Sequence, residues 1–175
     1  MTPEWSRPER VDTVGDRPRD VAIEADERER AGLARRFALL AVARLRAEWT
    51  LRREAGAIVA RGRVTGAVTQ ACSATGEPVP ATVDERVELR FVDETPVGEE
   101  ELELSADALD TLPIEGGAID LGEAAAETLA LALDPFPRAP GAEAALAEAG
   151  VLKEGEVGAA AFGALADLKS KLSGR

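Results

Sequence analysis

The chain has 175 residues, a length suited to one domain or to one domain with tails. It contains no His, no Tyr and a single Cys, which excludes Ser-His and Cys-His catalysis, imidazole-ligated zinc and a disulfide framework. The net charge of −12 is uneven, because residues 1–90 hold 16 Arg against 15 Asp or Glu, whereas residues 91–175 hold 5 Lys or Arg against 18 Asp or Glu.

The N-terminal region is polar and interrupted by prolines, and it predicts only short strands at residues 11–14 and 20–23. A helix is predicted over residues 26–40. Asp26 with Glu29 three positions later resembles a capping box, and apolar residues follow at helical spacing. We expect the apolar side of this helix to pack on a sheet.

Three segments that alternate apolar and polar residues follow, at residues 43–52, 58–72 and 79–91. A period of two is typical of strands with one buried and one solvated face. The segments are separated by a Gly-containing turn and by a short loop, so they predict an antiparallel β-meander.

The turn lengths also predict how these strands pair. A two-residue turn at 55–56 places Ala43 opposite Val68, and a loop that faces Cys72 with Val79 sets the second hairpin. Both registers gather the apolar residues on one face, which a slip of one residue would not do.

The solvated face of the three strands then carries seven arginines and three carboxylates. One interpretation is an ordinary charged sheet face; the other is a platform for phosphate groups, which arginine grips with two parallel donors. The face has no exposed aromatics for stacking bases, so contacts to the nucleic-acid backbone are favoured over base reading. The candidate RNA-contact residues are Arg44, Arg46, Arg52, Arg61, Arg63, Arg86 and Arg90.

The second half of the chain is acidic. Residues 93–103 hold six carboxylates, which we interpret as a solvated loop rather than a Mg²⁺ site. A second helix is predicted to begin at Asp120 with Glu123 as a further capping-box pair, and to end before Pro135. On this helix Glu123 and Glu127 are candidate contacts for a protein partner.

These patterns predict an α+β fold, in which an antiparallel β-meander of at least three strands packs against helices. We expect one domain over residues 1–140 and a partly flexible Ala/Glu/Gly-rich tail over residues 141–175 with a short amphipathic helix. No stretch approaches the length of about 20 apolar residues that crosses a bilayer, and the N-terminus does not resemble a signal peptide. We therefore expect a cytoplasmic location and no membrane partner.

Two stretches carry a resemblance to a known family. The first is VTGAVTQACSATGEPVPATVDERVELRFV and the second is GGAIDLGEAAAETLALALDPFPRAPGA. Together they resemble the YceD-like family, the large ribosomal RNA subunit accumulation proteins, over about residues 60–142. The positions that match the family's motifs are Cys72, Glu77, Pro78, Asp134, Pro135 and Pro137.

The resemblance implies a non-enzymatic ribosome-biogenesis factor that supports accumulation of large-subunit rRNA. Its implied partner is a 23S-type rRNA precursor or a ribosomal protein, with no small-molecule substrate and no cofactor. Many members carry Cys-x-x-Cys where this chain has Cys72 and Thr75, so a thiolate metal site is not expected here. The alternative is a protein-interaction module that uses the acidic C-terminal half without touching RNA.

Overall fold

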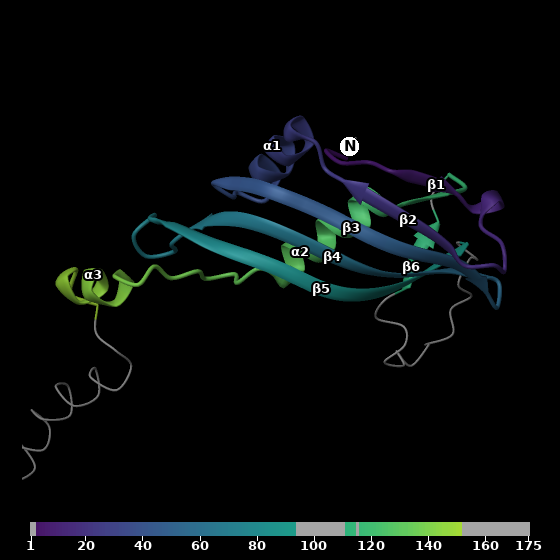
Figure 1. The fold of residues 1–175 in the computed structure, drawn as a ribbon. Helices are drawn as coiled ribbons and strands as arrows, with labels where there is room; N and C mark the ends of the chain where they lie inside the picture. Colours follow the sequence, from purple (N-terminus) through teal and green to yellow (C-terminus); the bar gives the residue numbers. More distant parts are fainter. Residues whose placement is uncertain (1–2, 94–110, 115, 152–175) are drawn as a thin grey trace, which may run out of the picture.

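A long, curved β-sheet forms the body of the protein, and helix α2 lies across one of its faces (Figure 1). The computed structural model describes residues 3–93, 111–114 and 116–151. The elements in chain order are β1 (Pro8–Arg10), the short 3₁₀ helix η1 (Val11–Thr13), β2 (Arg19–Glu24), α1 (Glu27–Arg36), β3 (Ala41–Glu54), β4 (Ala57–Ala71), β5 (Pro78–Asp93), β6 (Thr111–Ile114), β7 (Ala118–Asp120), α2 (Leu121–Ala132) and α3 (Ala142–Glu148).

The main sheet has the strand order β2-β3-β4-β5-β6, and a second small sheet pairs β1 with β7. All neighbours in the main sheet are antiparallel except β5 and β6, which are parallel. The predicted α+β fold and its central meander of β3, β4 and β5 are confirmed.

The first hairpin turns at Ala55 and Gly56, which both have positive φ values, 47° and 82°. Positive φ at both turn positions matches the twist of a two-residue hairpin. The predicted register holds from this turn up to Arg44, but Val42 and not Ala43 pairs with Val68. A β-bulge between Val42 and Arg44 adds one residue, so the prediction was wrong beyond that point.

The second hairpin is shifted by two residues from the prediction, because Gln70 rather than Cys72 pairs with Val79. The loop is shorter than predicted, because the Cys72 N–H donates a hydrogen bond to the Glu77 carbonyl at 2.7 Å. A shift of two changes the partners but leaves every side chain on its predicted face.

The N-terminal predictions were partly wrong. The strand predicted at 20–23 is present as β2, whereas the one at 11–14 includes the 3₁₀ helix η1. Helix α1 begins with the predicted capping box but ends at Arg36 instead of residue 40. Ala38 adopts a positive φ of 52°, and Leu40 already donates its N–H to the sheet at Thr69.

The hydrophobic core lies between α2, the N-terminal segment and one face of the sheet. Trp5, Leu33 and Leu129 are fully buried there together with the inward residues of β3 and β4. At Gly62 an added Cβ would lie 2.4 Å from Cε3 of Trp49, so the ring occupies the space that a side chain would fill. The sheet face opposite α2 is left without a covering layer of described residues (Figure 1).

Helix α3 lies within the part of the chain predicted to be a tail. Of the acidic loop predicted at 93–103, only Asp93 is described, as the last residue of β5, and the predicted amphipathic segment beyond residue 151 falls outside the described residues. No helix in the described part of the chain is long and apolar enough to cross a membrane.

Candidate nucleic-acid interface

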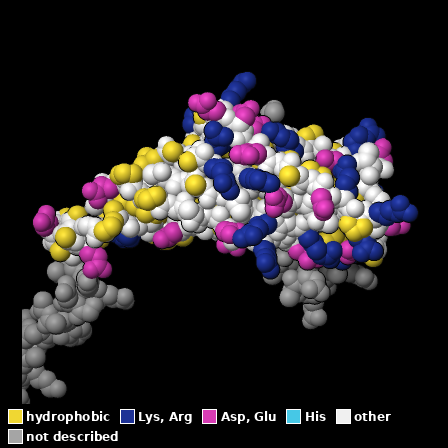
Figure 2. Space-filling view, in the orientation of Figure 1, with side chains coloured by type: hydrophobic (Ala, Val, Ile, Leu, Met, Phe, Trp, Pro, Cys, Tyr) yellow, Lys and Arg dark blue, Asp and Glu magenta, His cyan; other side chains and the backbone are white. Residues whose placement is uncertain are grey.

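All seven candidate arginines lie on the uncovered face of β3, β4 and β5, as the period-two pattern predicts. Figure 2 shows this face, with basic and acidic side chains interspersed over the strands. Cross-strand pairing sets Glu48 opposite Arg63 and Glu88 opposite Arg61, and on its other side Arg63 faces Arg86.

Two arginines of β4 are held by carboxylates of neighbouring strands, Arg61 from both β3 and β5 and Arg63 from β5 alone. Arg61 reaches Glu54 at 2.8 Å and Glu88 at 2.9 Å, and Arg63 contacts Asp84 through two nitrogens, each at 2.5 Å. The hydrogen bonds from these guanidinium groups lower the pKa of Glu54 and of Asp84. These arginines are therefore occupied in the free protein.

Two arginines of β3 are also paired, each through a single ion-pair contact. Arg46 contacts Glu48 at 2.6 Å, and Arg52 lies 3.7 Å from Glu54. These pairs are largely exposed to solvent, and such pairs contribute about 0–1 kcal/mol to stability. A phosphate group could therefore replace the carboxylate at little cost.

The remaining three candidates, Arg44, Arg86 and Arg90, form no ion pair with the described residues. The charge of Arg86 adds a small effect to the lowered pKa of Asp84, which is mainly due to Arg63. These three guanidinium groups keep their hydrogen-bond donors available.

The face is less positive than the sequence predicted, because strand β2 and the first turn add acidic residues to it. Asp20 accepts a hydrogen bond from Thr50, and Glu24 lies opposite Arg46. With Glu54, six carboxylates face the seven arginines on these strands, where three were expected. The pairing of β2 with β3 could not be derived from turn lengths, so its contribution was missed.

The two candidate partner contacts on α2 have different surroundings. Glu123 accepts two hydrogen bonds from Arg36 of α1, at 2.6 and 2.8 Å, and this ion pair links the two helices. Glu127 forms no ion pair or hydrogen bond with the described residues, and burial together with the charge of Glu123 raises its pKa. Only Glu127 is available to a partner.

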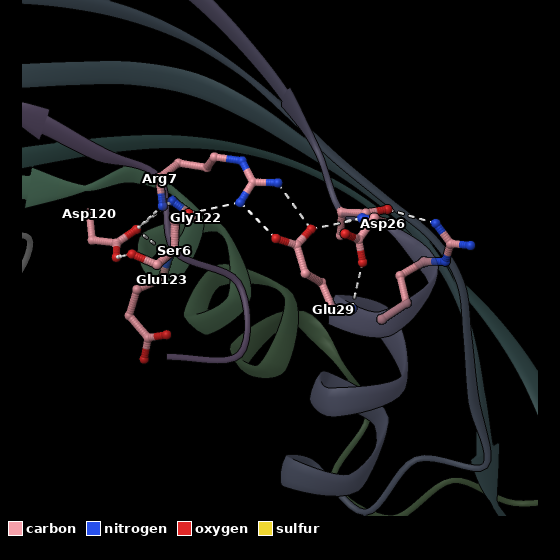
Figure 3. Close-up of polar contacts among 9 residues, drawn as sticks. Ser6, Arg7, Asp26, Glu29, Asp120, Gly122 and Glu123 are labelled. Atoms are coloured by element: carbon pink, nitrogen blue, oxygen red, sulfur yellow. Dashed lines mark hydrogen bonds and ion pairs between the residues drawn. The ribbon is translucent and has the colours of Figure 1, made fainter. Parts of the chain in front are cut away.

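The start of α2 is fixed by Asp120, whose carboxylate accepts bonds from the N–H groups of Gly122 and Glu123 (Figure 3). The same carboxylate accepts bonds from the Arg7 N–H at 2.7 Å and from the Ser6 hydroxyl. The predicted N-cap is thus confirmed, but Glu123 does not close the box, since its side chain reaches Arg36 instead.

Arg7 connects this cap to the cap of α1. Its guanidinium donates to both oxygens of Glu29, at 2.7 and 3.0 Å, and Glu29 in turn accepts the N–H of Asp26 (Figure 3). The sequence predicted the Asp26–Glu29 pair but gave no signal for Arg7.

The two stretches that carry the family motif contact each other, although some 60 residues separate them. Ser73 donates from its N–H and its hydroxyl to the Pro137 carbonyl, at 2.8 and 3.1 Å. Gln70 donates to the Asp134 carbonyl at 2.8 Å. The segment after α2 is therefore fastened to the β4–β5 loop, which places Glu77 and Pro78 near the same end of the sheet.

Cys72 is buried at this junction and accepts the Ala139 N–H at 3.3 Å. That bond, with a smaller effect from the Thr75 hydroxyl and backbone N–H groups, lowers the pKa of the thiol to about 6. The Thr75 hydroxyl also donates to a Glu77 carboxylate oxygen at 3.0 Å. Within the described residues no three Cys, Asp or Glu side chains are grouped so that they could hold a metal ion.

A small α+β protein with an uncovered, charged sheet face is the class that these features define. The family model for "Large ribosomal RNA subunit accumulation protein YceD" matches residues 60–169, which is more than half of the chain. The chain belongs to the YceD family, which confirms the resemblance. Comparisons with curated proteins and with solved structures found no match.

Proposed function

We propose that this protein supports the accumulation of large-subunit rRNA by binding a precursor of that RNA, without catalysing a reaction, in the cytoplasm. The family description links its members to large-subunit rRNA. The observation that carries the direct-contact part of the proposal is the presence of Arg44, Arg86 and Arg90 on an uncovered sheet face without carboxylate partners.

The chemistry of this face favours the phosphate backbone over the bases. The large aromatic side chains of the strands, Trp49 and Phe91, are buried on the opposite face and cannot stack on bases. Arginine forks bind phosphate by two parallel donors, and the ion pairs of Arg61 and Arg63 are exposed enough to exchange. Binding of this kind has low sequence specificity and depends strongly on salt.

A pull-down of the tagged full-length protein from cells, with and without nuclease, tests the proposal. We expect large-subunit rRNA precursor to be recovered under ultraviolet crosslinking, and its yield to fall when Arg44, Arg86 and Arg90 are changed to Ala. Recovery of protein partners alone, unchanged by nuclease, would overturn direct RNA binding.

A second candidate function is the recruitment of a basic assembly partner by the acidic half. It is favoured by Leu131, which is 87% exposed one helical turn after the unpaired Glu127, and by Phe136, which is 70% exposed in the segment after α2. An apolar and acidic surface suits a partner segment that combines lysine or arginine with apolar residues. In this case Glu127→Lys should abolish co-purification of the partner, while the three arginine substitutions should leave it unchanged.

A further inference from the structure

Strand β3 extends beyond the end of its neighbour β2. The pairing of β2 covers residues 46–51 of β3, and the last backbone contact on this side is the Ala25 N–H to the Leu45 carbonyl at 3.0 Å. On this side, no strand of the described chain pairs with residues 41–44. A strand edge without a neighbour presents N–H and C=O groups to any chain that can lie beside it.

A groove of about 440 Å³ lies between this free edge and helix α1. Its lining is largely apolar and comes from both elements, with Ala31 and Ala34 of the helix facing Leu39 and Val42 of the strand side. Leu40, also in the lining, is 54% exposed. The groove therefore leaves apolar surface open to solvent in line with the path of β2.

The rim of the groove is basic. Arg30 and Arg35 line it, and Arg44 directly follows the lining residue Ala43. None of these three arginines forms an ion pair with the described residues, and Glu27 is the single carboxylate of the lining. Figure 2 shows hydrophobic and basic side chains close together where β3 passes below α1.

We propose that this groove binds an extended acidic segment of a partner protein, which adds to the sheet as a strand beside residues 41–44. In such a segment alternate side chains point to opposite sides. One set would pack on Ala34 and Val42, while the carboxylates of the other set would point to the uncovered face and reach Arg44. Arg35, which lines the groove beside Ala34, would add to the attraction for an acidic segment. Backbone bonds give affinity in this mode of recognition, and the alternating side chains give specificity.

RNA fits this groove less well than a peptide does. Its lining holds no aromatic side chain, and a sugar-phosphate chain gains nothing from alanine and valine. A peptide satisfies the free strand edge, the apolar lining and the basic rim together. The inference is independent of the proposed function, although Arg44 would belong to both surfaces.

The test uses the full-length ¹⁵N-labelled protein and a blocked eight-residue peptide that alternates Glu and Val. We expect chemical-shift changes and slowed amide exchange at residues 41–44 and shifts at Ala31 and Ala34. Changing Arg35 and Arg44 to Glu should weaken the peptide at least tenfold, whereas the matched reversal Arg86→Glu should weaken it less than twofold. Unchanged spectra of the free variants outside the substituted sites establish that they remain folded.

The result that overturns the proposal is the absence of shifts in the groove at peptide concentrations of about 1 mM, the weak limit of measurable recognition. Equal binding of the counterpart with Lys in place of Glu would also overturn it, as would an equal loss in Arg86→Glu. A single-stranded RNA oligonucleotide that shifts residues 31–35 while the peptide does not would assign the groove to RNA instead. Arg35 belongs to α1 and not to the charged sheet face. A loss of peptide affinity in Arg35→Glu alone would therefore report on the groove and not on the proposed RNA surface.

Discussion

The two faces of the sheet are held by different physical forces. The face below α2 is stabilised by close packing. The Trp49 ring occupies the space that a side chain at Gly62 would need, and Leu129 packs against Gly66. The opposite face is held by ion pairs, most of which are exposed and individually weak. Because its ion pairs are weak, the uncovered face can be changed at little cost to folding, as a binding surface requires.

Gly62→Ala tests the covered face and should have the largest effect. The new Cβ would lie 2.7 Å from the Glu48 carbonyl as well as against the Trp49 ring, so the strand or the ring must move. We expect a loss of about 2–3 kcal/mol in the free energy of unfolding, measured by denaturant melts.

The matched control is Gly66→Ala, where the nearest atom to an added Cβ is the flexible Leu129 Cδ1 at 3.1 Å. We expect a change within about 1 kcal/mol, since the better strand propensity of alanine offsets a small movement. Equal losses at both positions would show that close packing at Trp49 is not what distinguishes this face.

Asp120→Ala tests the hydrogen bonds that position the start of α2 on the covered face. It removes the N-cap of α2 and the acceptor for the Arg7 N–H and the Ser6 hydroxyl. We expect a loss of about 1–2 kcal/mol in thermal or denaturant unfolding. Asp120→Asn keeps an acceptor oxygen and should lose less; a loss as large as in Asp120→Ala would argue against the capping role.

Arg63→Ala tests the uncovered face and should have the smallest effect on stability. The side chain and its partner Asp84 are both about half exposed, so the pair contributes about 0–1 kcal/mol. Arg86→Ala, which breaks no ion pair, is the matched control. A loss of more than about 2 kcal/mol in Arg63→Ala alone would mean that this face is structural, and not free for binding.

The sequence was sufficient to predict the meander and the face of the seven arginines, because a period of two needs no knowledge of loop geometry. The face of Ala43 was predicted wrongly, since the bulge buries Val42 in its place. It could not predict the bulge after Val42 or the closure of the Cys72–Glu77 loop, since both depend on local backbone geometry. These errors moved the partners of Arg63 and Arg61 but not their face.

The charge balance of the candidate site was harder to predict. The carboxylates of Asp20 and Glu24 come from β2, whose position beside β3 is a long-range contact that turn lengths do not specify. The contact between the β4–β5 loop and Pro137 is of the same kind. Composition and spacing identify such residues one by one but do not bring them together.

The central claim is that the unpaired arginines of the uncovered face bind the rRNA backbone, and the salt dependence of binding tests it most directly. For a fragment of large-subunit rRNA precursor, we predict that changing Arg44, Arg86 and Arg90 to Ala reduces the slope of log affinity against log salt by about 2. Changing the paired Arg46, Arg61 and Arg63 to Ala should reduce it by less. A slope that the first set leaves at the wild-type value, or that both sets reduce equally, would contradict the claim.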